Sequence, residues 1–392
     1  MDNKVLFQVY MAKADSADER CVYLDLPAKP YEILNALERL RLKEGEILYF
    51  EVEDYDGHGY LSPYLDEDCT IQDLNTLAER LSRLEPQEQT VFRGLLQMET
   101  DRRRGPVSVG QLIDYAYNTD CCHVVSAGND AELGRFYVEN DFLPELEKVP
   151  EQMLDLLDYE KIGRQFRENE GGVFVDGCYV VQHTEPCHIC DSWNRRQQKP
   201  DYIFRFQMET YPFAGCQTRT ADLALPMKKW DLVEHLERMD IPDWAHCVIR
   251  DVDSALPGLF FPSEHLPETN LLATEVRRME QEGQLRKYKA ILEAMDCHDV
   301  HNAILLAEVM DDFALEDNVL TPEDLAVNHI QSLTEGASLE LLLQHLDAEA
   351  YGQALLLQEN AVLTPYGLLR REDGGPIQSR TDAPVQTMEQ SL

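Results

Sequence analysis

Basic residues are scarce in this chain and are missing from two long stretches. The 392 residues contain 35 Lys and Arg against 73 Asp and Glu, a formal net charge of −38 at pH 7. No Lys or Arg lies between Lys43 and Arg80, where eleven acids occur, or between Lys289 and Arg370, where fifteen occur. Such a charge repels nucleic acids and acidic membrane surfaces, so a partner chosen by electrostatics is basic.

Long hydrophobic runs are absent as well. No run approaches the ~18 apolar residues that a membrane-spanning helix needs. The short apolar stretch after Lys4 alternates like a strand and does not resemble a signal peptide. Without a secretion signal, the ten cysteines indicate reduced thiols. We therefore expect a soluble, multidomain, cytoplasmic protein that binds neither membranes nor nucleic acid.

Motifs of common catalytic sites are also missing. The chain has no G-x-S-x-G, Walker or H-E-x-x-H motif, so we expect no enzyme and no cofactor. The one cluster of metal-ligand types is Cys187-x-x-Cys190, with His183 and His188 nearby. A tetrahedral zinc site needs further ligands at suitable spacing, and the neighbouring sequence does not supply them. Free thiols in a linker are the preferred interpretation.

The first 182 residues alternate between strand and helix patterns. Stretches rich in β-branched and aromatic residues predict strands over 5–12 and 46–55, with a helix over 27–42 between them. Further helices are predicted over 70–84, 86–99, 108–120, 130–142 and 150–169, followed by a hairpin over 171–182. Ser108 is suited to cap its helix. The predicted fold class is α+β, an elongated series of small α/β and helical modules.

The same order of patterns returns in the second half. Residues 157–166 read LDYEKIGRQF, and residues 346–355 read LDAEAYGQAL. Two more pairs match, 26–40 with 225–239 and 75–85 with 270–280. The offset drifts from 199 to 189, as small loop deletions would produce, so the sequence predicts a tandem duplication with a diverged second copy. In the repeated phrase, Gly163 and Gly352 are predicted to permit close helix packing or a bend.

The repeat and the composition shifts together predict a modular organisation. The first copy has a strand-helix-strand module (1–60), an acidic helical module (61–104) and a helical module with a terminal hairpin (105–182). A linker carrying the Cys pair spans 183–200. The second copy follows as 201–262, 263–312 and 313–372, and the tail at 373–392 is expected to be disordered.

One long stretch resembles a known family. Residues 130–166 read DAELGRFYVENDFLPELEKVPEQMLDLLDYEKIGRQF, after LIDYAYNTD and before the hairpin GGVFVDGCYVV. This ordered series is similar to the C-terminal part of ArdA antirestriction proteins, and the resemblance extends over roughly residues 5–182. It implies an elongated DNA mimic without catalytic activity that occupies the DNA-binding groove of type I restriction–modification enzymes and protects mobile genetic elements. Family members are usually homodimers, so we expect either a homodimer or a monomer whose two copies form a pseudo-dimer.

The resemblance also implies which residues stand in for phosphates. The candidates are the acids of the matching stretches: Glu51, Glu53, Asp54, Asp56, Asp66, Glu67, Asp68, Asp73, Asp114, Asp120, Asp130, Glu132, Glu139, Asp141, Glu145, Glu147, Asp155, Asp158 and Glu160. Any one of them could equally be an ordinary solvated charge near a helix start.

Two other functions remain open at this stage. An acidic adaptor for a basic protein partner would show an exposed apolar patch beside the acids. A zinc-dependent enzyme built on Cys187 and Cys190 would show a concave pocket with perturbed titrating groups.

Overall fold

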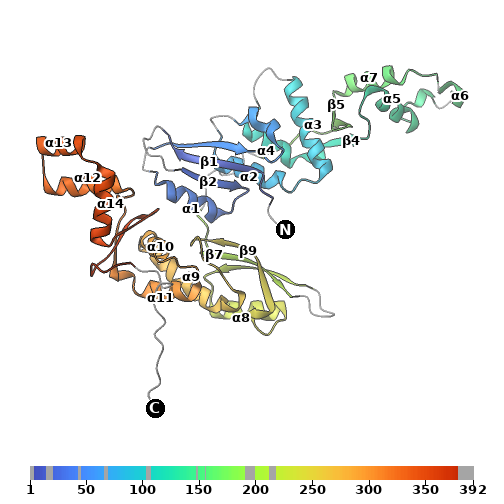
Figure 1. Cartoon of the computed structure of the whole chain (residues 1–392). Coiled ribbons are helices and arrows are strands. Elements are labelled where there is room, and N and C mark those ends of the chain that lie inside the picture. Colours follow the sequence, from blue (N-terminus) through green and yellow to red (C-terminus); the bar gives the residue numbers. More distant parts are fainter. Residues whose placement is uncertain are drawn as a thin grey trace, which may run out of the picture. The chain divides into compact units, whose positions relative to one another are not determined.

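The computed structural model describes residues 4–14, 21–42, 46–65, 69–102, 107–146, 149–154, 156–189, 199–211 and 218–377. The chain divides into two compact units, and they do not follow the midpoint of the sequence. Unit 1 comprises Met1–Ala28 and Leu42–Gln198, and unit 2 comprises Lys29–Arg41 and Lys199–Leu392. Both units mix small antiparallel sheets with helices, which confirms the predicted α+β class (Figure 1).

Unit 1 contains two three-stranded sheets with helices between them. The first sheet has the order β2–β1–β3, and the second has the order β4–β6–β5. In chain order the elements are β1 (Phe7–Lys13), β2 (Cys21–Leu26), β3 (Leu48–Asp54), α2 (Ile71–Leu81), α3 (Pro86–Arg102), α4 (Val109–Tyr117), β4 (Cys122–Val125), α5 (Asp130–Glu139), α6 (Glu151–Leu154), α7 (Tyr159–Glu170), β5 (Val173–Val175) and β6 (Cys178–Gln182). Two strands, β2 and β4, were not predicted from the sequence.

Residues 204–371 of unit 2 repeat the order of elements over residues 7–182, in which helix α1 (Pro30–Leu40) lies between β2 and β3. Its sheets have the orders β8–β7–β9 and β10–β12–β11. The elements are β7 (Phe204–Thr210), β8 (Thr220–Leu225), α8 (Lys229–Met239), β9 (Cys247–Ser254), α9 (Leu266–Gln281), α10 (Leu285–Ala294), α11 (Val300–Glu308), β10 (Phe313–Glu316), α12 (Pro322–Leu333), α13 (Ala337–His345), α14 (Ala348–Glu359), β11 (Val362–Thr364) and β12 (Gly367–Arg371).

Side-chain caps explain where many of these helices begin. The Ser108 hydroxyl accepts the Gln111 backbone N–H at the start of α4, so the predicted cap is confirmed. Asp158 and Asp347 accept backbone N–H groups at the starts of α7 and α14, each at 3.0 Å. The repeated phrase therefore begins with the same cap in each unit.

An asparagine clamp also recurs in the two units. The Asn75 amide accepts the Ala28 N–H at 2.7 Å and donates to the Ala28 carbonyl at 3.0 Å. Asn270 does the same to Met227, at 2.8 and 2.9 Å. In each unit, the asparagine belongs to the first long helix after the sheet. Its side chain binds the backbone of the residue that follows a Leu-Pro pair.

The two glycines of the repeated phrase lie at close helix crossings. A Cβ on Gly163 would lie 1.9 Å from the Asp130 carbonyl oxygen of α5, and one on Gly352 would lie 1.9 Å from the Pro322 carbonyl oxygen of α12. Only a residue without a side chain allows the backbones to approach this closely. The predicted close packing is confirmed.

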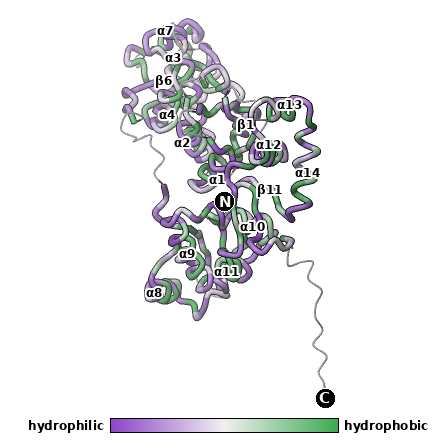
Figure 2. Tube along the Cα trace, turned by 90° about the vertical axis from the view of Figure 1, so that its left-hand side faces the viewer, coloured by the Kyte–Doolittle hydropathy of each residue, from purple (hydrophilic) through white to green (hydrophobic). Residues whose placement is uncertain are grey.

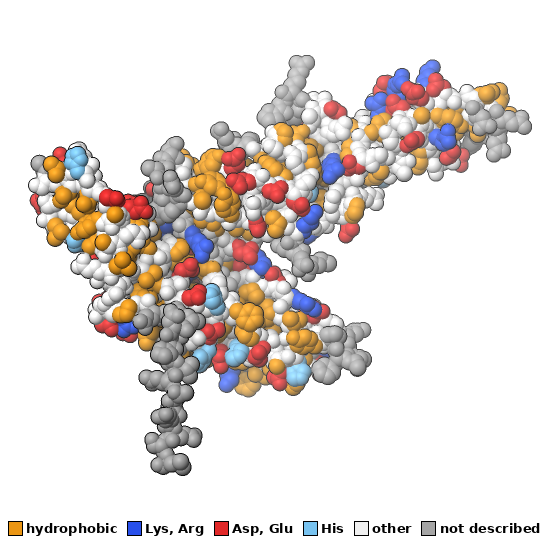
Figure 3. All heavy atoms as spheres, viewed as in Figure 1, with side chains coloured by type: hydrophobic (Ala, Val, Ile, Leu, Met, Phe, Trp, Pro, Cys, Tyr) orange, Lys and Arg blue, Asp and Glu red, His pale blue; other side chains and the backbone are white. Residues whose placement is uncertain are grey.

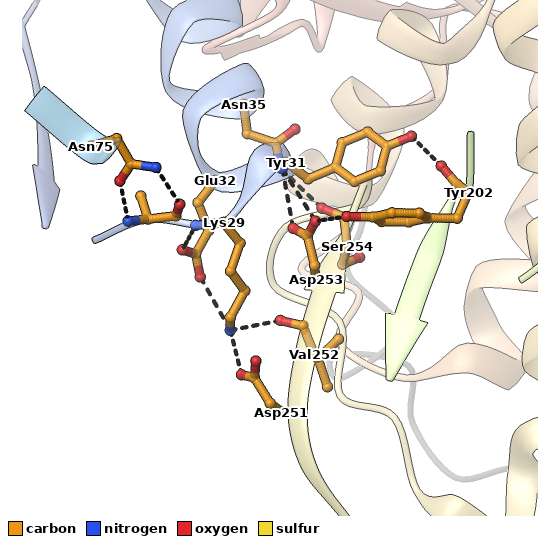
Figure 4. A network of polar contacts seen from close by, with 11 residues as sticks. Lys29, Tyr31, Glu32, Asn35, Asn75, Tyr202, Asp251, Val252, Asp253 and Ser254 are labelled. Carbon is orange, nitrogen blue, oxygen red and sulfur yellow. Dashed lines mark hydrogen bonds and ion pairs between the residues drawn. The ribbon is translucent and has the colours of Figure 1, made fainter. Parts of the chain in front are cut away.

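Helix α1 (Pro30–Leu40) folds into unit 2, although its sequence belongs to the first strand-helix-strand module. At its start, the buried Asp253 carboxylate accepts the Tyr31 backbone N–H at 3.1 Å and the Tyr202 hydroxyl at 2.6 Å (Figure 4). Burial raises the pKa of Asp253. Lys29 reaches Asp251, with a nitrogen–oxygen distance of 2.5 Å. An acid of β9 thus satisfies an N–H group that the helix start leaves unpaired.

Contacts continue along α1 to its other end. Lys289 of α10 donates to Glu38 at 2.6 Å and to Asn35 at 2.9 Å. Arg41 donates to the Tyr366 carbonyl at 2.9 Å. Tyr31 belongs to the main hydrophobic core of unit 2, which extends from the β8–β7–β9 sheet to β12. The helix is therefore an integral part of that core.

Hydrophobic and hydrophilic residues alternate along the trace in both units (Figure 2). Among the described residues, no helix is long and apolar enough to cross a membrane.

Candidate partner-binding surface

The solvent-facing side of the first sheet gathers acids from the base-free tract after Lys43. Tyr10 of β1 pairs with Glu51 and Gln8 pairs with Asp54, and the register shifts between these two pairs. The shift is a β-bulge that leaves Glu53 as the extra residue. Glu51, Glu53 and Asp54 are all exposed, whereas strict alternation would turn Asp54 to the opposite face from the two glutamates.

Three tyrosines share this side of the sheet. The Tyr10 ring packs edge-on against Tyr23 and Tyr49, with centroid distances of 5.6 and 6.4 Å. The Tyr49 hydroxyl donates to Glu51 at 2.8 Å, and this bond raises the pKa of Tyr49. The charge of Glu53 likewise raises the pKa of Tyr23. We call this surface the tyrosine–carboxylate face; its residues are Tyr10, Tyr23, Tyr49, Glu51, Glu53 and Asp54.

Among the described residues, the lysine ion pairs near the tyrosine–carboxylate face lie beyond its two ends. Within the described part of the chain, no Lys, Arg or His forms an ion pair with its three carboxylates. Lys4 pairs with Asp56 at 3.1 Å beyond the end of β3, and Lys13 pairs with Glu46 at 3.2 Å before its start. Figure 3 shows carboxylates beside hydrophobic side chains over β1 and β2. No ion pair with a described cation therefore offsets the charge of these three acids.

Two of the candidate acids point inward instead. Asp73, 5% exposed, accepts the Thr70 hydroxyl at 2.8 Å in the capping box that starts α2. Asp114, 6% exposed, accepts the Ile189 backbone N–H at 2.8 Å and lies 3.3 Å from Nδ1 of His188. Both carboxylates stabilise the fold and are not accessible to a partner. The Thr70-x-x-Asp73 capping pattern is the sequence signal that could have identified the first of them.

Several candidates near the second sheet have local partners. Asp130 accepts two hydrogen bonds from Arg167, and Glu160 pairs with Arg164 on α7. Glu132 accepts the Gly128 backbone N–H at 2.7 Å, and Asp158 is the cap of α7. The remaining candidates in this region are exposed and have no ion pair with a described residue: Asp120, Glu139, Asp141 and Glu145.

Other predicted residues cannot be placed. Asp66, Glu67, Asp68, Glu147, Asp155 and Cys190 lie outside the described residues. Cys187 is exposed, and its backbone N–H donates to Asn118 at 2.8 Å. The described residues contain no group of three or more His, Cys, Asp or Glu side chains placed to hold a metal ion.

The Asp130–Arg167 pair leads to a prediction about acid stability. The hydrogen bonds from Arg167 hold the pKa of Asp130 below its usual value. The pair therefore stabilises the fold fully above about pH 4, the usual unfolded pKa, and the contribution is lost as pH falls through the lower folded pKa. Asp130→Asn should cost about 1–2 kcal/mol at pH 7 and much less at pH 2, as measured by urea unfolding. An equal loss at both pH values would contradict this prediction.

The corresponding sheet in unit 2 carries its own cations. Arg205 of β7 pairs with Asp222 of β8, and Arg250 of β9 pairs with Glu209 of β7. Gln8, the residue of β1 that corresponds to Arg205, is uncharged. The two sheets therefore share a topology but differ in surface charge.

These features define an acidic protein with a small-module α+β scaffold and an exposed acidic sheet face. Residues 19–181 match the family described as antirestriction protein (ArdA). This stretch, which includes most of unit 1 and helix α1 of unit 2, is of the ArdA type, and the resemblance predicted from the sequence is confirmed. A search of curated proteins gave no match to the chain.

Proposed function

We propose that this antirestriction protein mimics double-stranded DNA and blocks the basic DNA-binding groove of type I restriction–modification enzymes. Inhibition would require no catalysis, only occupation of the groove. The observation that carries the proposal is the tyrosine–carboxylate face, where three exposed acids lie on one strand without a described cationic partner.

The spacing along a strand suits such mimicry. Successive strand residues rise by about 3.3 Å. B-form DNA carries a phosphate about every 3.4 Å of axis on each strand. Glu51 and Glu53, two residues apart, therefore lie about 6.6 Å apart along the strand, roughly two axial phosphate steps, and the bulge adds Asp54 one residue further on. We propose that the exposed acids Asp120, Glu139, Asp141 and Glu145 extend this surface.

Neutralising the three acids of β3 tests the proposal. We expect Glu51→Gln/Glu53→Gln/Asp54→Asn to weaken binding to a type I enzyme on the order of 100-fold, at about 1 kcal/mol for each lost contact. The salt dependence of binding should also become shallower, since fewer charges take part. Titration of the purified enzyme at several salt concentrations measures both effects.

The matched control removes the same charge elsewhere. Glu308, Asp311 and Asp312 are exposed acids of unit 2, and none forms an ion pair with a described residue. Glu308→Gln/Asp311→Asn/Asp312→Asn should leave inhibition near the wild-type level. If both triple variants lose inhibition equally, net charge is the cause, and the tyrosine–carboxylate face is not the mimic surface.

One observation favours a second candidate function, an adaptor for a basic protein. Tyr23 and Tyr49 are 54% and 47% exposed beside the acids, so the face offers apolar as well as charged contact. Tyr23→Ser/Tyr49→Ser should abolish binding to such a partner. For a DNA-binding groove the loss should be smaller than that of the acid variant, and the comparison separates the two functions.

We also propose that residues 201–372 are a second, diverged ArdA-type copy. The repeated element order, the matching sheet orders and the paired asparagine clamps support this. The pairing of acids with arginines on the second sheet suggests that this copy contributes less to mimicry. An experimental structure in which 201–372 had a different strand order from 5–182 would contradict the duplication.

A further inference from the structure

Helices α1 and α8 are counterparts in sequence but differ in what covers them. Tyr31 and Leu34 of α1 correspond to Trp230 and Val233 of α8 at the constant offset of 199, and Lys29 and Lys228 are the residues that precede the two helices. Tyr31 is 3% exposed, because it lies in the core of unit 2. Trp230 is 82% exposed and Val233 is 40% exposed. A face that is buried on α1 is therefore bare on α8.

The start of α8 is also basic, which is unusual in this acidic chain. Lys228 and Lys229 are both exposed, and neither forms an ion pair with a described residue. Lys29, the counterpart of Lys228, contacts β9 at the start of the packed helix α1. It pairs with Asp251 and also donates to the Val252 carbonyl at 2.8 Å.

The surface that receives α1 has a counterpart in unit 1, at the end of β3. In unit 2, the Tyr31 backbone N–H donates to Asp253. In the β7–β9 register, Asp253 lies opposite Arg205. The residue in the same register position of the first sheet is Asp54, opposite Gln8. Asp54 is exposed and lies beside Glu53, with no cation bound among the described residues. Asp54 accepts the backbone N–H of its neighbour Asp56 at 3.1 Å, whereas Asp253 accepts the N–H of a docked helix start.

We propose that α8 of one chain docks on the end of β3 of a second copy, giving a head-to-tail association. Lys228 and Lys229 would pair with Glu53 and Asp54, and Trp230 would pack against the tyrosines of the same face. Opposite charges and exposed aromatic rings lie on both sides, as in a stable protein interface. The association uses the tyrosine–carboxylate face but does not depend on DNA mimicry.

Sedimentation over a wide range of protein concentration tests the association. The wild-type mass should rise with concentration above the 45.1 kDa of one chain. Trp230→Glu should weaken the association at least ~10-fold, as loss of a central aromatic does at interfaces. Trp230 is so exposed that its replacement should leave the fold intact, which circular dichroism checks. A wild-type protein of 45.1 kDa at all concentrations, or a variant that associates like wild type, would overturn the proposal.

A charge exchange tests the partner surface. Lys228→Glu/Lys229→Glu should abolish association, and mixing this variant with Glu53→Lys/Asp54→Lys should restore a heterodimer. Failure of the mixture to associate would overturn the assignment to β3. The proposed function is tested separately, by inhibition at dilutions where the chain is single. Trp230→Glu should inhibit normally there, while loss of inhibition in the β3 amide variant reports on mimicry alone.

Discussion

Gly163→Ala is expected to lower the free energy of unfolding of the α5–α7 region by more than about 3 kcal/mol. The added Cβ would lie 1.9 Å from the Asp130 carbonyl oxygen and 2.7 Å from the Gly134 nitrogen. Both are backbone atoms, so no side-chain rotation relieves the clash. The helices would have to separate, which would weaken the Asp130–Arg167 pair and the stacking of Tyr137 on Phe166, whose ring centroids are 4.0 Å apart.

Hydrogen exchange of the α5 and α7 amides, together with thermal unfolding, measures this effect. Gly59→Ala is the matched control, because its Cβ would meet no atom within 4 Å and its backbone is not in the left-handed region. Wild-type protection of α5 and α7 in the Gly163→Ala variant would mean that the crossing is looser than the structure indicates.

Lys289→Met is expected to destabilise unit 2 by about 3–5 kcal/mol. The ammonium is 5% exposed and binds Glu38 at 2.6 Å and Asn35 at 2.9 Å. Burial lowers the pKa of Lys289, yet Glu38 favours its charged form. Methionine would fill the space, and among the described residues Arg286, at 3.6 Å, would be the ion-pair partner left to the Glu38 carboxylate. The loss should appear in urea unfolding and in faster exchange of the α1 amides.

A double variant separates the ion pair from simple packing. Lys289→Met/Glu38→Leu removes both charges, so it should recover most of the stability that the single variant loses. If the double variant is as unstable as the sum of the two single variants, the pair is not coupled. In that case the other contacts of α1, at Tyr31 and at Arg41, would hold it in unit 2.

Part of the charge pattern is local in sequence and part is not. In the sequence, the second base-free tract, between Lys289 and Arg370, is a second long stretch of acids with no Lys or Arg among them. In the structure, Arg41 and Arg286 lie 3.7 and 3.4 Å from Asp317, and Arg370 pairs with Glu359 at 2.7 Å. The first tract has no such partners at Glu51, Glu53 and Asp54 among the described residues. The two tracts therefore differ in whether arginines lie near their acids in three dimensions, which the sequence of either tract does not reveal.

The sequence by itself determined the composition of this surface and most of the elements. Strands predicted over 5–12 and 46–55 are β1 and β3, and the long helices follow their hydrophobic periodicity, because periodicity depends on near neighbours. The strands β2 and β4, of six and four residues, were missed, whereas the equally short β5 and β6 were predicted because glycines mark their hairpin. Segments β2 and β4 become strands because β1 and β6 offer them hydrogen-bond partners.

The tertiary structure alone decided three features on which function depends: the bulge at Glu53, the burial of Asp73 and Asp114, and the inclusion of α1 in unit 2. Each depends on residues that are distant in sequence. Asp253 binds the start of α1 across more than two hundred residues, and no local pattern encodes such a pairing.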